Sequence, residues 1–412
     1  MFASMIETYA KAYRGLPRTV WILSLVMFIN RCGTMVLPFL TLYLTQEKGI
    51  DIQVAGQVLA VYGLGSILGG YLGGWFCDRL GSINIQIISL VLSGGGFMIL
   101  GFQENLNAII LIVFLLAVVT EAFRPANGAA LAEFCPSKLR ARAVAFNRIA
   151  INLGAAMGPA LGGFLASFDY GLLFWIDGLT CWAAALVTAI MLGADRRPVK
   201  VGREEEPQGE GRHPMRDGSF LLFLLLITLA GTCLFQYFST YPVYLNEFYG
   251  FSETGFGLLA SLNGVMIIAF EMLLTQWCER FDHSRVMGLG ACIMCLGFGV
   301  LPFSTEMLVA VASMVIWTVG EMVFIPLAGG FVANRGGTRH RGKYMGLFTM
   351  SWGVCFVSAP YFGTKIYQNL SPQAVWYGVI LVGFLIWIGF EILGRRIKGE
   401  SAAAVPCSGN AA

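Results

Sequence analysis

Long apolar segments constrain the fold of this chain more than any other feature. A helix that crosses a bilayer needs about 20 predominantly apolar residues, and twelve segments are that long. The predicted spans are residues 19–44, 53–76, 83–102, 107–132, 143–167, 170–193, 220–245, 254–277, 285–303, 307–332, 344–367 and 374–394. They are too long for barrel strands and lack alternation. Only 12% of the residues are charged, against roughly 25% in soluble domains. We therefore predict an all-α, multi-pass integral membrane protein with twelve transmembrane helices.

The positive charges predict the orientation in the membrane. Of the 27 Lys and Arg residues, 22 lie in the termini and connections on one side, and only Lys48 and Lys365 lie on the other. The remaining three are Arg31, Arg124 and Arg148, which lie inside predicted spans. Cytoplasmic connections carry an excess of Lys and Arg. We expect both termini in the cytoplasm, the plasma (inner) membrane of a bacterium as location, and an Arg148 side chain that extends toward the cytoplasm.

An internal repeat divides the chain into two halves. Residues recur at a constant separation of 201 positions. Examples are Tyr43 and Tyr244, Gly56 and Gly257, Pro125 and Pro326, Arg140 and Arg341, and Trp175 and Trp376. We predict a six-helix half at 1–193, a cytoplasmic linker at 194–219, a second six-helix half at 220–398, and a disordered tail at 399–412. Two halves with the same orientation imply a pseudo-two-fold axis along the membrane normal and a site between them near the midplane.

The connection after the second predicted helix carries a short motif, Gly74-x-x-x-Asp78-Arg79-x-Gly81. It resembles the GxxxDRxG signature of the major facilitator superfamily, and the repeat and the twelve helices agree with that resemblance. The resemblance implies the major facilitator fold and a conformational latch at this end, in which we include Arg341. The family's further basic residues are replaced here by Ser82-Ile83-Asn84, so we expect a weaker or differently partnered latch. The alternative interpretation is a short polar turn with a helix cap.

The fifth predicted helix contains a glycine motif formed by Gly154, Gly158, Pro159, Gly162 and Gly163. It resembles the GxxxGPxxGG motif of the drug:proton antiporter branch of the same superfamily. Small residues four positions apart let helices approach closely, and we expect a tight contact between the halves that suppresses leak. Generic packing of small residues is the alternative.

Six ionisable residues are predicted deep in the membrane, where such groups usually face a cavity or a partner. They are Arg31, Glu121, Arg124, Asp177, Glu271 and Glu321. The segment around Arg124 resembles the family's basic motif, whose arginine is implicated in proton coupling. Four acids against two arginines leave two acids without a cation, and burial favours the protonated form of such acids. Glu321 and Asp177 are the leading candidates for proton carriers, with Glu121 and Arg124 as a switchable ion pair. A fixed structural network is the alternative for each acid, and for Glu271 the two interpretations stand level.

Superfamily architecture implies that the first, fourth, seventh and tenth helices line a central cavity. The expected substrate-cavity residues are Asn30, Thr34, Asn127, Phe235, Gln236, Tyr237 and Tyr241. The aromatic side chains of the seventh helix suit an amphiphilic or aromatic solute. The Cys292-x-x-Cys295 pair lies inside a span, and we interpret it as packed thiols.

These features predict a monomeric transporter that exports small amphiphilic or drug-like molecules in exchange for protons by alternating access. Its expected partners are a small-molecule substrate, protons and the lipid bilayer, with no cofactor, metal or nucleic acid. A proton-coupled importer of peptides, organic acids or another nutrient is the main alternative. A non-transporting scaffold or receptor is a further alternative, but it has no need for buried charges. No nucleophile–base pair, metal cluster or phosphate loop is visible, so an enzyme is not expected.

Overall fold

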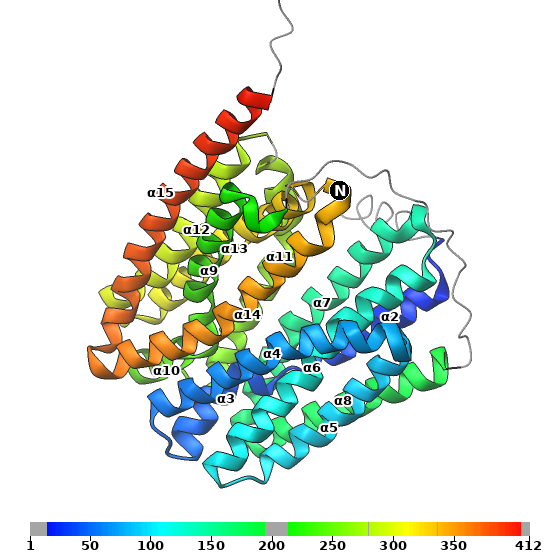
Figure 1. The fold of residues 1–412 in the computed structure, drawn as a ribbon. Coiled ribbons are helices and arrows are strands. Elements are labelled where there is room, and N and C mark those ends of the chain that lie inside the picture. The colour runs from blue at the N-terminus through cyan, green and yellow to red at the C-terminus, as the bar shows by residue number, and fades with distance from the viewer. Residues whose placement is uncertain (1–14, 194–212, 279, 336, 405–412) are drawn as a thin grey trace, which may run out of the picture.

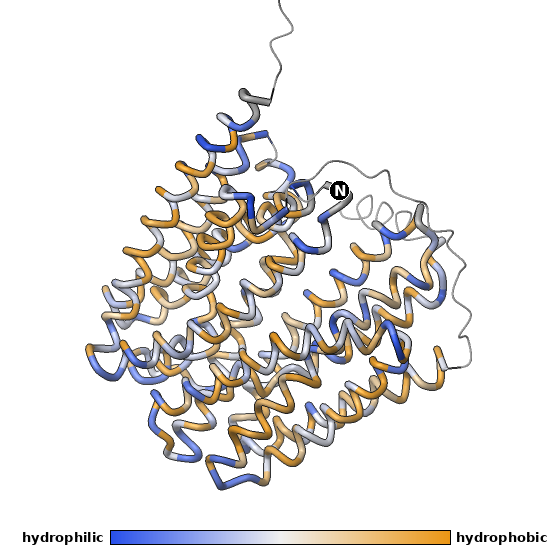
Figure 2. Tube along the Cα trace, in the orientation of Figure 1, coloured by the Kyte–Doolittle hydropathy of each residue, from blue (hydrophilic) through white to orange (hydrophobic). Residues whose placement is uncertain are grey.

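The computed structural model describes residues 15–193, 213–278, 280–335 and 337–404, apart from several side chains near the helix ends around 137–141, 333–341 and 401–404. Every regular element in these ranges is a helix. They form 12 spans that are long and apolar enough to cross a membrane. The helices are apolar along most of their length and hydrophilic mainly at their ends (Figure 2). The prediction of twelve transmembrane helices is confirmed.

Helices of the N-terminal half match the predicted segments, except that the first span is broken. They are α2 (Arg18–Cys32), α3 (Val36–Leu42), η1 (Tyr43–Glu47), α4 (Ile52–Leu80), α5 (Ser82–Gly101), α6 (Leu106–Phe134), α7 (Ser137–Ala166) and α8 (Gly171–Leu192).

The C-terminal half repeats this order and has its own broken first span. Its elements are η2 (Pro214–Arg216), α9 (Gly218–Leu234), η3 (Phe235–Phe238), α10 (Thr240–Tyr249), α11 (Glu253–Cys278), α12 (His283–Gly299), η4 (Leu301–Phe303), α13 (Met307–Arg335), α14 (Gly337–Asn369) and α15 (Pro372–Ala404).

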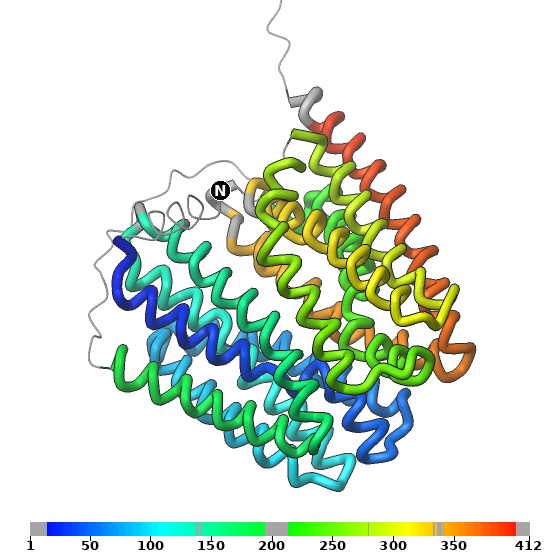
Figure 3. Tube along the Cα trace, turned by 180° about the vertical axis from the view of Figure 1, so that it is seen from behind, coloured from blue at the N-terminus to red at the C-terminus, as the bar shows by residue number. Residues whose placement is uncertain are grey.

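The two halves form two helix bundles that lie side by side (Figures 1 and 3). In the N-terminal half α2 packs on α7, α4 on α6 and α5 on α8. In the C-terminal half the equivalent pairs α9 and α14, α11 and α13, and α12 and α15 pack in the same way. The repeat found in the sequence is therefore a repeat of three-dimensional structure.

The first span of each half is interrupted at the same relative position. Pro38 and Pro242 have no backbone N–H, so each leaves the carbonyl four residues before it without its helical partner. For Pro242 that carbonyl belongs to Phe238, and it accepts a hydrogen bond of 2.9 Å from the Thr41 hydroxyl of the other half. The break between α2 and α3 lies at Gly33–Met35. The continuous helices expected at 19–44 and 220–245 were therefore wrong in this detail.

The halves touch on one side of the bundle and separate toward the other. We call the side where α8 ends and η2 begins the linker side, and the opposite side the distal side. On the distal side the Gln368 amide donates to Asp51 across the halves at 2.6 Å. A Cβ atom at Gly63 would lie 2.7 Å from the backbone of Phe356 in α14.

Toward the linker side this contact between α4 and α14 ends. A Cβ atom at Gly353 would still meet Ile67, whereas one at Gly70, Gly74 or Gly346 would meet no atom within 4 Å. The contact between α4 and α14 is thus present on the distal side and absent near the linker-side ends of both helices.

The linker-side end of the C-terminal half is held by a buried ion pair. Arg335 at the end of α13 donates two hydrogen bonds to Asp217, at 2.7 and 2.8 Å, and Tyr344 donates a third at 2.9 Å. Burial opposes ionisation of Asp217, but these hydrogen bonds outweigh it and hold the pKa of its carboxyl below the ordinary value. The Asp217 hydrogen bond in turn raises the pKa of Arg335.

Two predicted boundaries differ from those in the structure. Arg335 also contacts Glu400 at 2.6 Å, and α15 continues to Ala404, so residues 399–404 are helical and not a disordered tail. Residues 405–412 lie outside the described part. The predicted linker, 194–219, ends earlier than expected because η2 and α9 occupy its last residues, and residues 194–212 are outside the described part.

Candidate transport site

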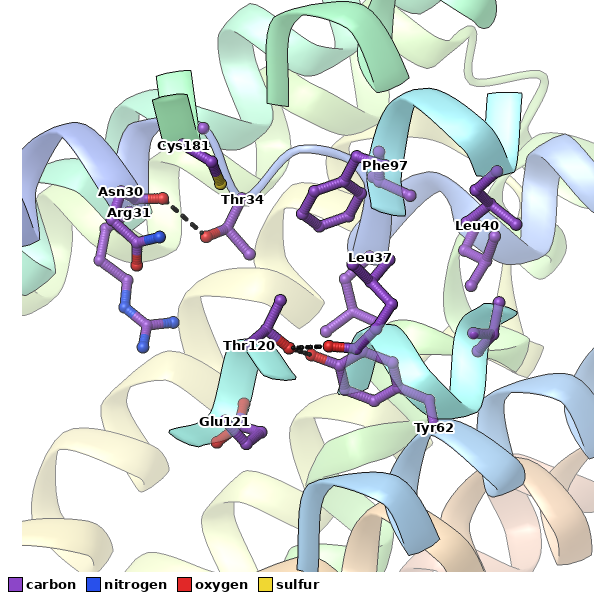
Figure 4. A pocket seen from close by; sticks show the side chains of 15 residues that line it. Asn30, Arg31, Thr34, Leu37, Leu40, Tyr62, Phe97, Thr120, Glu121 and Cys181 are labelled. Atoms are coloured by element: carbon purple, nitrogen blue, oxygen red, sulfur yellow. Dashed lines mark hydrogen bonds between the residues drawn. The ribbon is translucent and has the colours of Figure 1, made fainter. Parts of the chain in front are cut away.

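A cavity that is partly open to its surroundings lies among the helices of the N-terminal half. Asn30 and Arg31 reach it from the last turn of α2, Thr34 from the break between α2 and α3, and Glu121 from α6. Arg31 and Glu121 lie at one end of it, and Leu37, Leu40 and Phe97 lie at the other (Figure 4). Four of the residues predicted as cavity or coupling residues therefore lie together. The cavity is polar at one end and apolar at the other.

Three charged side chains gather near the polar end. Glu121 and Arg124 lie one helical turn apart on α6, with 3.6 Å between carboxylate oxygen and guanidinium nitrogen. Arg31 makes no ion pair with the described residues, and its Nε is buried without a hydrogen-bond partner among them. The predicted Glu121–Arg124 pair is present, whereas Arg31 remains an unneutralised cation.

Glu321 lies in the other half, on α13. Its carboxylate accepts a hydrogen bond of 2.8 Å from the Asn263 side chain of α11, and the same amide lies 3.1 Å from the Thr318 hydroxyl. None of the ion pairs within the described ranges involves Glu321. The acid predicted to lack a cation is thus held by neutral groups.

Asp177 occupies a different environment from the one expected of a proton carrier. It is fully buried, and its carboxylate accepts backbone N–H groups of Met35 at 3.1 Å and Val36 at 2.9 Å. These N–H groups begin α3, and the first N–H groups of a helix have no partner inside that helix. Asp177 therefore caps the second part of the broken span. It does not line the cavity described above, which is a correction to its predicted place.

Glu271 forms an ion pair with Arg148. Glu271 lies on α11 and Arg148 on α7, so the contact joins the two halves on the linker side of the point where Ser261 donates to the Ala156 carbonyl. That the Arg148 side chain extends toward the cytoplasm stays a prediction, whereas its acidic partner on the other half was not expected. Sequence reasoning missed the pair because each residue lies on a different half, 123 positions apart.

Three predicted cavity residues are buried inside their own halves instead. Asn127 bonds the Asn147 amide at 3.0 Å. Gln236 donates to the Ala359 carbonyl at 2.9 Å and accepts from Thr240 at 2.8 Å. The Tyr241 ring is fully buried. These side chains stabilise the fold, and they correct the prediction that they line a substrate cavity.

Phe235 and Tyr237 remain partly exposed, and Phe235 joins an aromatic cluster between the halves. The Phe356 ring of α14 lies 4.3 Å from Phe235, 5.2 Å from Phe238 and 5.9 Å from Tyr62 of the N-terminal half, measured between centroids. Sequence reasoning identified Phe235 but not Tyr62, Phe356 or Phe238 as members of this cluster. Their helical spacing alone does not show which aromatic side chains meet across the two bundles.

The predicted latch residues lie at the linker-side end of α4, where the halves are apart. Asp78 is exposed and has no hydrogen bond or ion pair with a described residue. The Arg79 guanidinium stacks on Trp75, 3.7 Å from the ring centroid. Gly81 has a φ of 86°, which favours glycine, and Gly74 borders open space. The side chain of Arg341 lies outside the described part. A latch role for these residues stays a prediction.

The glycine motif of α7 makes two different contacts. Cβ atoms at Gly154, Gly158 and Gly162 would meet Arg31, Cys32 and Met35 of the same half, at 2.5 to 3.2 Å. Only Gly163 faces the other half, where its Cβ would lie 2.3 Å from the Glu253 carbonyl. The expectation of a contact between halves therefore holds for Gly163, and through the Pro159 carbonyl beside Gly257. The other three glycines instead let α7 pack closely against the break in the first span, next to Arg31.

Comparisons with known proteins agree with this architecture. The family model described as Major Facilitator Superfamily matches residues 23–255 and 241–404. A "Na(+), Li(+), K(+)/H(+) antiporter" of Planococcus maritimus is 23% identical, with 89% of this chain and 92% of the relative covered. "Multidrug resistance protein MdtH" of Aeromonas salmonicida is 21% identical, with 79% and 82% covered.

A solved structure shows the same fold. A POT family transporter in complex with a thioalcohol-conjugated peptide superposes with a TM-score of 0.77 at 15% identity, over 93% of this chain and 96% of that one. With twelve spans in two repeated halves and a family match across nearly the whole chain, this multi-pass integral membrane protein belongs to the major facilitator superfamily, whose members are transporters and not enzymes.

Proposed function

We propose that this transporter exports small amphiphilic or drug-like molecules in exchange for protons. The observation that carries the proposal is the environment of Glu321: a partly buried carboxyl group with one neutral amide donor and no described cation within 4 Å. A carboxyl group placed in this way gains or loses a proton without breaking an ion pair. Buried ionisable groups in membrane proteins commonly form proton pathways.

The groups packed around Glu321 support reversible protonation. Asn263 faces it from α11 and Thr318 from its own helix, while the Tyr237 phenol of η3 lies within electrostatic range. All three are neutral. When the halves open to water on either side, hydration favours the ionised form, and when they close, desolvation favours the protonated form. The proton affinity of Glu321 therefore follows the conformation.

The contacts between halves support alternating access. On the distal side the halves are joined by hydrogen bonds that include Gln368 to Asp51 and Thr41 to Phe238, while α4 and α14 lose contact toward the linker side. With the termini in the cytoplasm, as the positive charges predict, this arrangement supports an inward-facing orientation. Protonation would favour one orientation and cargo binding the other, so that the binding of one ligand disfavours the binding of the other.

Purified protein in liposomes tests the proposal. An imposed pH gradient is applied, a panel of amphiphilic compounds is added, and proton movement is read with an internal pH-sensitive dye. We expect compound-dependent proton movement in the native protein and none in Glu321→Gln. Glu391→Gln is the matched control. Glu391 of α15 pairs with Arg285 of α12 and lies outside the cavity. Unchanged proton movement in Glu321→Gln would reject its role.

Import is the second candidate function, and the unneutralised Arg31 favours it for an anionic nutrient. The same liposomes separate the two directions. Export predicts that labelled solute and protons move in opposite directions, whereas import with protons predicts movement in the same direction.

A further inference from the structure

We propose that the cavity of the N-terminal half recognises an anionic group, and that its cargo is an organic anion with an apolar tail or ring, bound through Arg31. This inference deepens the proposed function, because it names the class of molecule that would enter the cavity. It concerns binding only, so it does not depend on the direction of transport.

The Arg31 side chain lacks an acidic partner among the described residues. Its Nε–H is buried without a hydrogen-bond partner among the described residues, and no carboxylate within those residues lies within 4 Å of the guanidinium. A buried cation without a partner is costly in a membrane. Guanidinium donors match a carboxylate in a two-point geometry that fixes the ligand's orientation. An incoming anion would satisfy both requirements at once.

The backbone that carries Arg31 is held in place before any ligand arrives. Gly154 and Gly158 of α7 lie so close that an added Cβ would meet the Arg31 Cβ at 2.5 Å and the Arg31 carbonyl at 3.1 Å. Asp177 fixes the other end of the break by binding the N–H groups of Met35 and Val36. Preorganised donors lose less entropy on binding.

The charges around the cavity do not cancel. Asp177 is committed to backbone N–H groups, and Glu121 pairs with Arg124 at 3.6 Å. One acid therefore serves two arginines, which leaves one positive charge for the ligand. The remaining polar neighbours are uncharged: Tyr62 lies 3.4 Å from Thr120, and Thr34 donates to the Asn30 carbonyl at 3.0 Å.

The apolar end of the cavity limits what can accompany the anion. Leu37, Leu40 and Phe97 lie at this end, away from Arg31 (Figure 4), and Leu100 and Val113 also line the cavity. An inorganic anion would leave this end unfilled, so an aromatic or aliphatic carboxylate fits best.

Equilibrium binding to the full-length protein in detergent, without a pH gradient, tests the inference. The probes are the fluorescent 2-naphthoate, its primary amide of nearly the same shape, and 2-naphthylmethylamine as the cation. We expect 2-naphthoate to bind at least about tenfold more tightly than the amide, and the amine to bind most weakly. Arg31→Gln should abolish the preference for the carboxylate, and Arg31→Lys should restore part of it.

Two further variants keep the test decisive. Glu121→Gln removes the competing acid, so we expect it to tighten 2-naphthoate binding severalfold, which a folding defect would not do. Arg396→Gln removes an exposed positive charge outside the cavity and should change nothing. Equal affinity for carboxylate and amide in the native protein, a retained preference in Arg31→Gln, or weaker 2-naphthoate binding in Glu121→Gln would each overturn the inference. Anion binding without coupled export would leave it standing and reject only the proposed function.

Discussion

The two halves share one architecture but place their polar groups differently. Positions 62 and 120 of the N-terminal half correspond, 201 residues later, to positions 263 and 321 of the C-terminal half. In the first half Tyr62 and Thr120 lie 3.4 Å apart, and in the second Asn263 donates to Glu321 at 2.8 Å. The contact between helices is retained while its chemistry changes from two hydroxyls to an amide and a carboxylate. The two halves thus share the position of this contact, but only the C-terminal half has a carboxyl group there.

The linker-side ends of the two halves also differ, because one is polar and the other is apolar. Asp217, Arg335 and Tyr344 form a buried polar cluster in the C-terminal half. Their equivalents are Leu16, Phe134 and Ala143, which are buried in an apolar cluster. The same place between three helices is therefore filled either by ion pairing or by apolar packing. The backbone geometry does not dictate which one is used, and single variants can show what each contributes.

The largest expected effect concerns Glu321. Glu321→Thr gives both halves the same residue, and we expect proton-coupled transport to fall by about 100-fold or more. Adding Thr120→Glu places an acid in the N-terminal half, beside Arg31 in the same cavity. We expect no recovery, because Arg31 would neutralise the new carboxylate. Proton movement in liposomes is the measurement, and recovery in the double variant would show that the half carrying the acid is unimportant.

The next effect concerns the polar cluster of the C-terminal half. Asp217→Leu should lower the free energy of unfolding by about 1–3 kcal/mol, because Arg335 and Tyr344 lose their shared acceptor while Arg335 keeps Glu400. Asp217→Leu with Arg335→Phe reproduces the residues of the N-terminal half and should recover most of that loss. Unfolding in detergent, followed by tryptophan fluorescence, measures both variants. If the double variant is as unstable as the single one, apolar packing cannot replace the ion pair in this half.

A smaller effect concerns Asp177, which caps the helix break of the N-terminal half. Asp177→Asn keeps one acceptor for the start of α3 but loses the charge, and we expect a loss of about 1–2 kcal/mol in the free energy of unfolding. Because Asp177 caps a helix, the variant should retain most of the proton-coupled transport that Glu321→Thr loses. Both quantities are measured in the same preparations. Complete loss of transport in a stable Asp177→Asn protein would return Asp177 to the proton pathway.

The smallest effect is the pH dependence of the polar cluster. The pKa of Asp217 is lower in the folded protein than its ordinary value, which is about 3.9 for aspartate. Its contribution is complete above that ordinary value and is lost as the pH falls through the lower, folded pKa. Between pH 5 and about pH 3 the native protein should therefore lose more stability than the Asp217→Leu, Arg335→Phe double variant. Parallel unfolding curves for the two proteins would contradict this sign.

Much of the fold follows from the sequence because the bilayer imposes the length and polarity of each span. The repeat also follows, since Pro125 and Pro326 or Trp175 and Trp376 keep their separation. The individual partners do not follow. Asp177 was expected in a cavity, but its two acceptor oxygens bind the N–H groups of residues 142 and 141 positions away. Gln236 looked like a cavity residue, yet the backbone of α14 uses its amide. Such contacts depend on helix rotation, which an apolar composition on all sides leaves unspecified.

On the distal side, the backbones of Gly163 and Gly257 meet so closely that a Cβ on Gly257 would lie 3.0 Å from the Gly163 Cα and 2.3 Å from the Pro159 carbonyl. One methyl group at this point would act as a wedge. It would leave the cavity and its charges untouched while penalising the shut form of this face. In the proposed alternating-access cycle, the balance between the two orientations would depend partly on the absence of side chains at Gly163 and Gly257, and cargo affinity measured from either compartment would shift if a side chain were added.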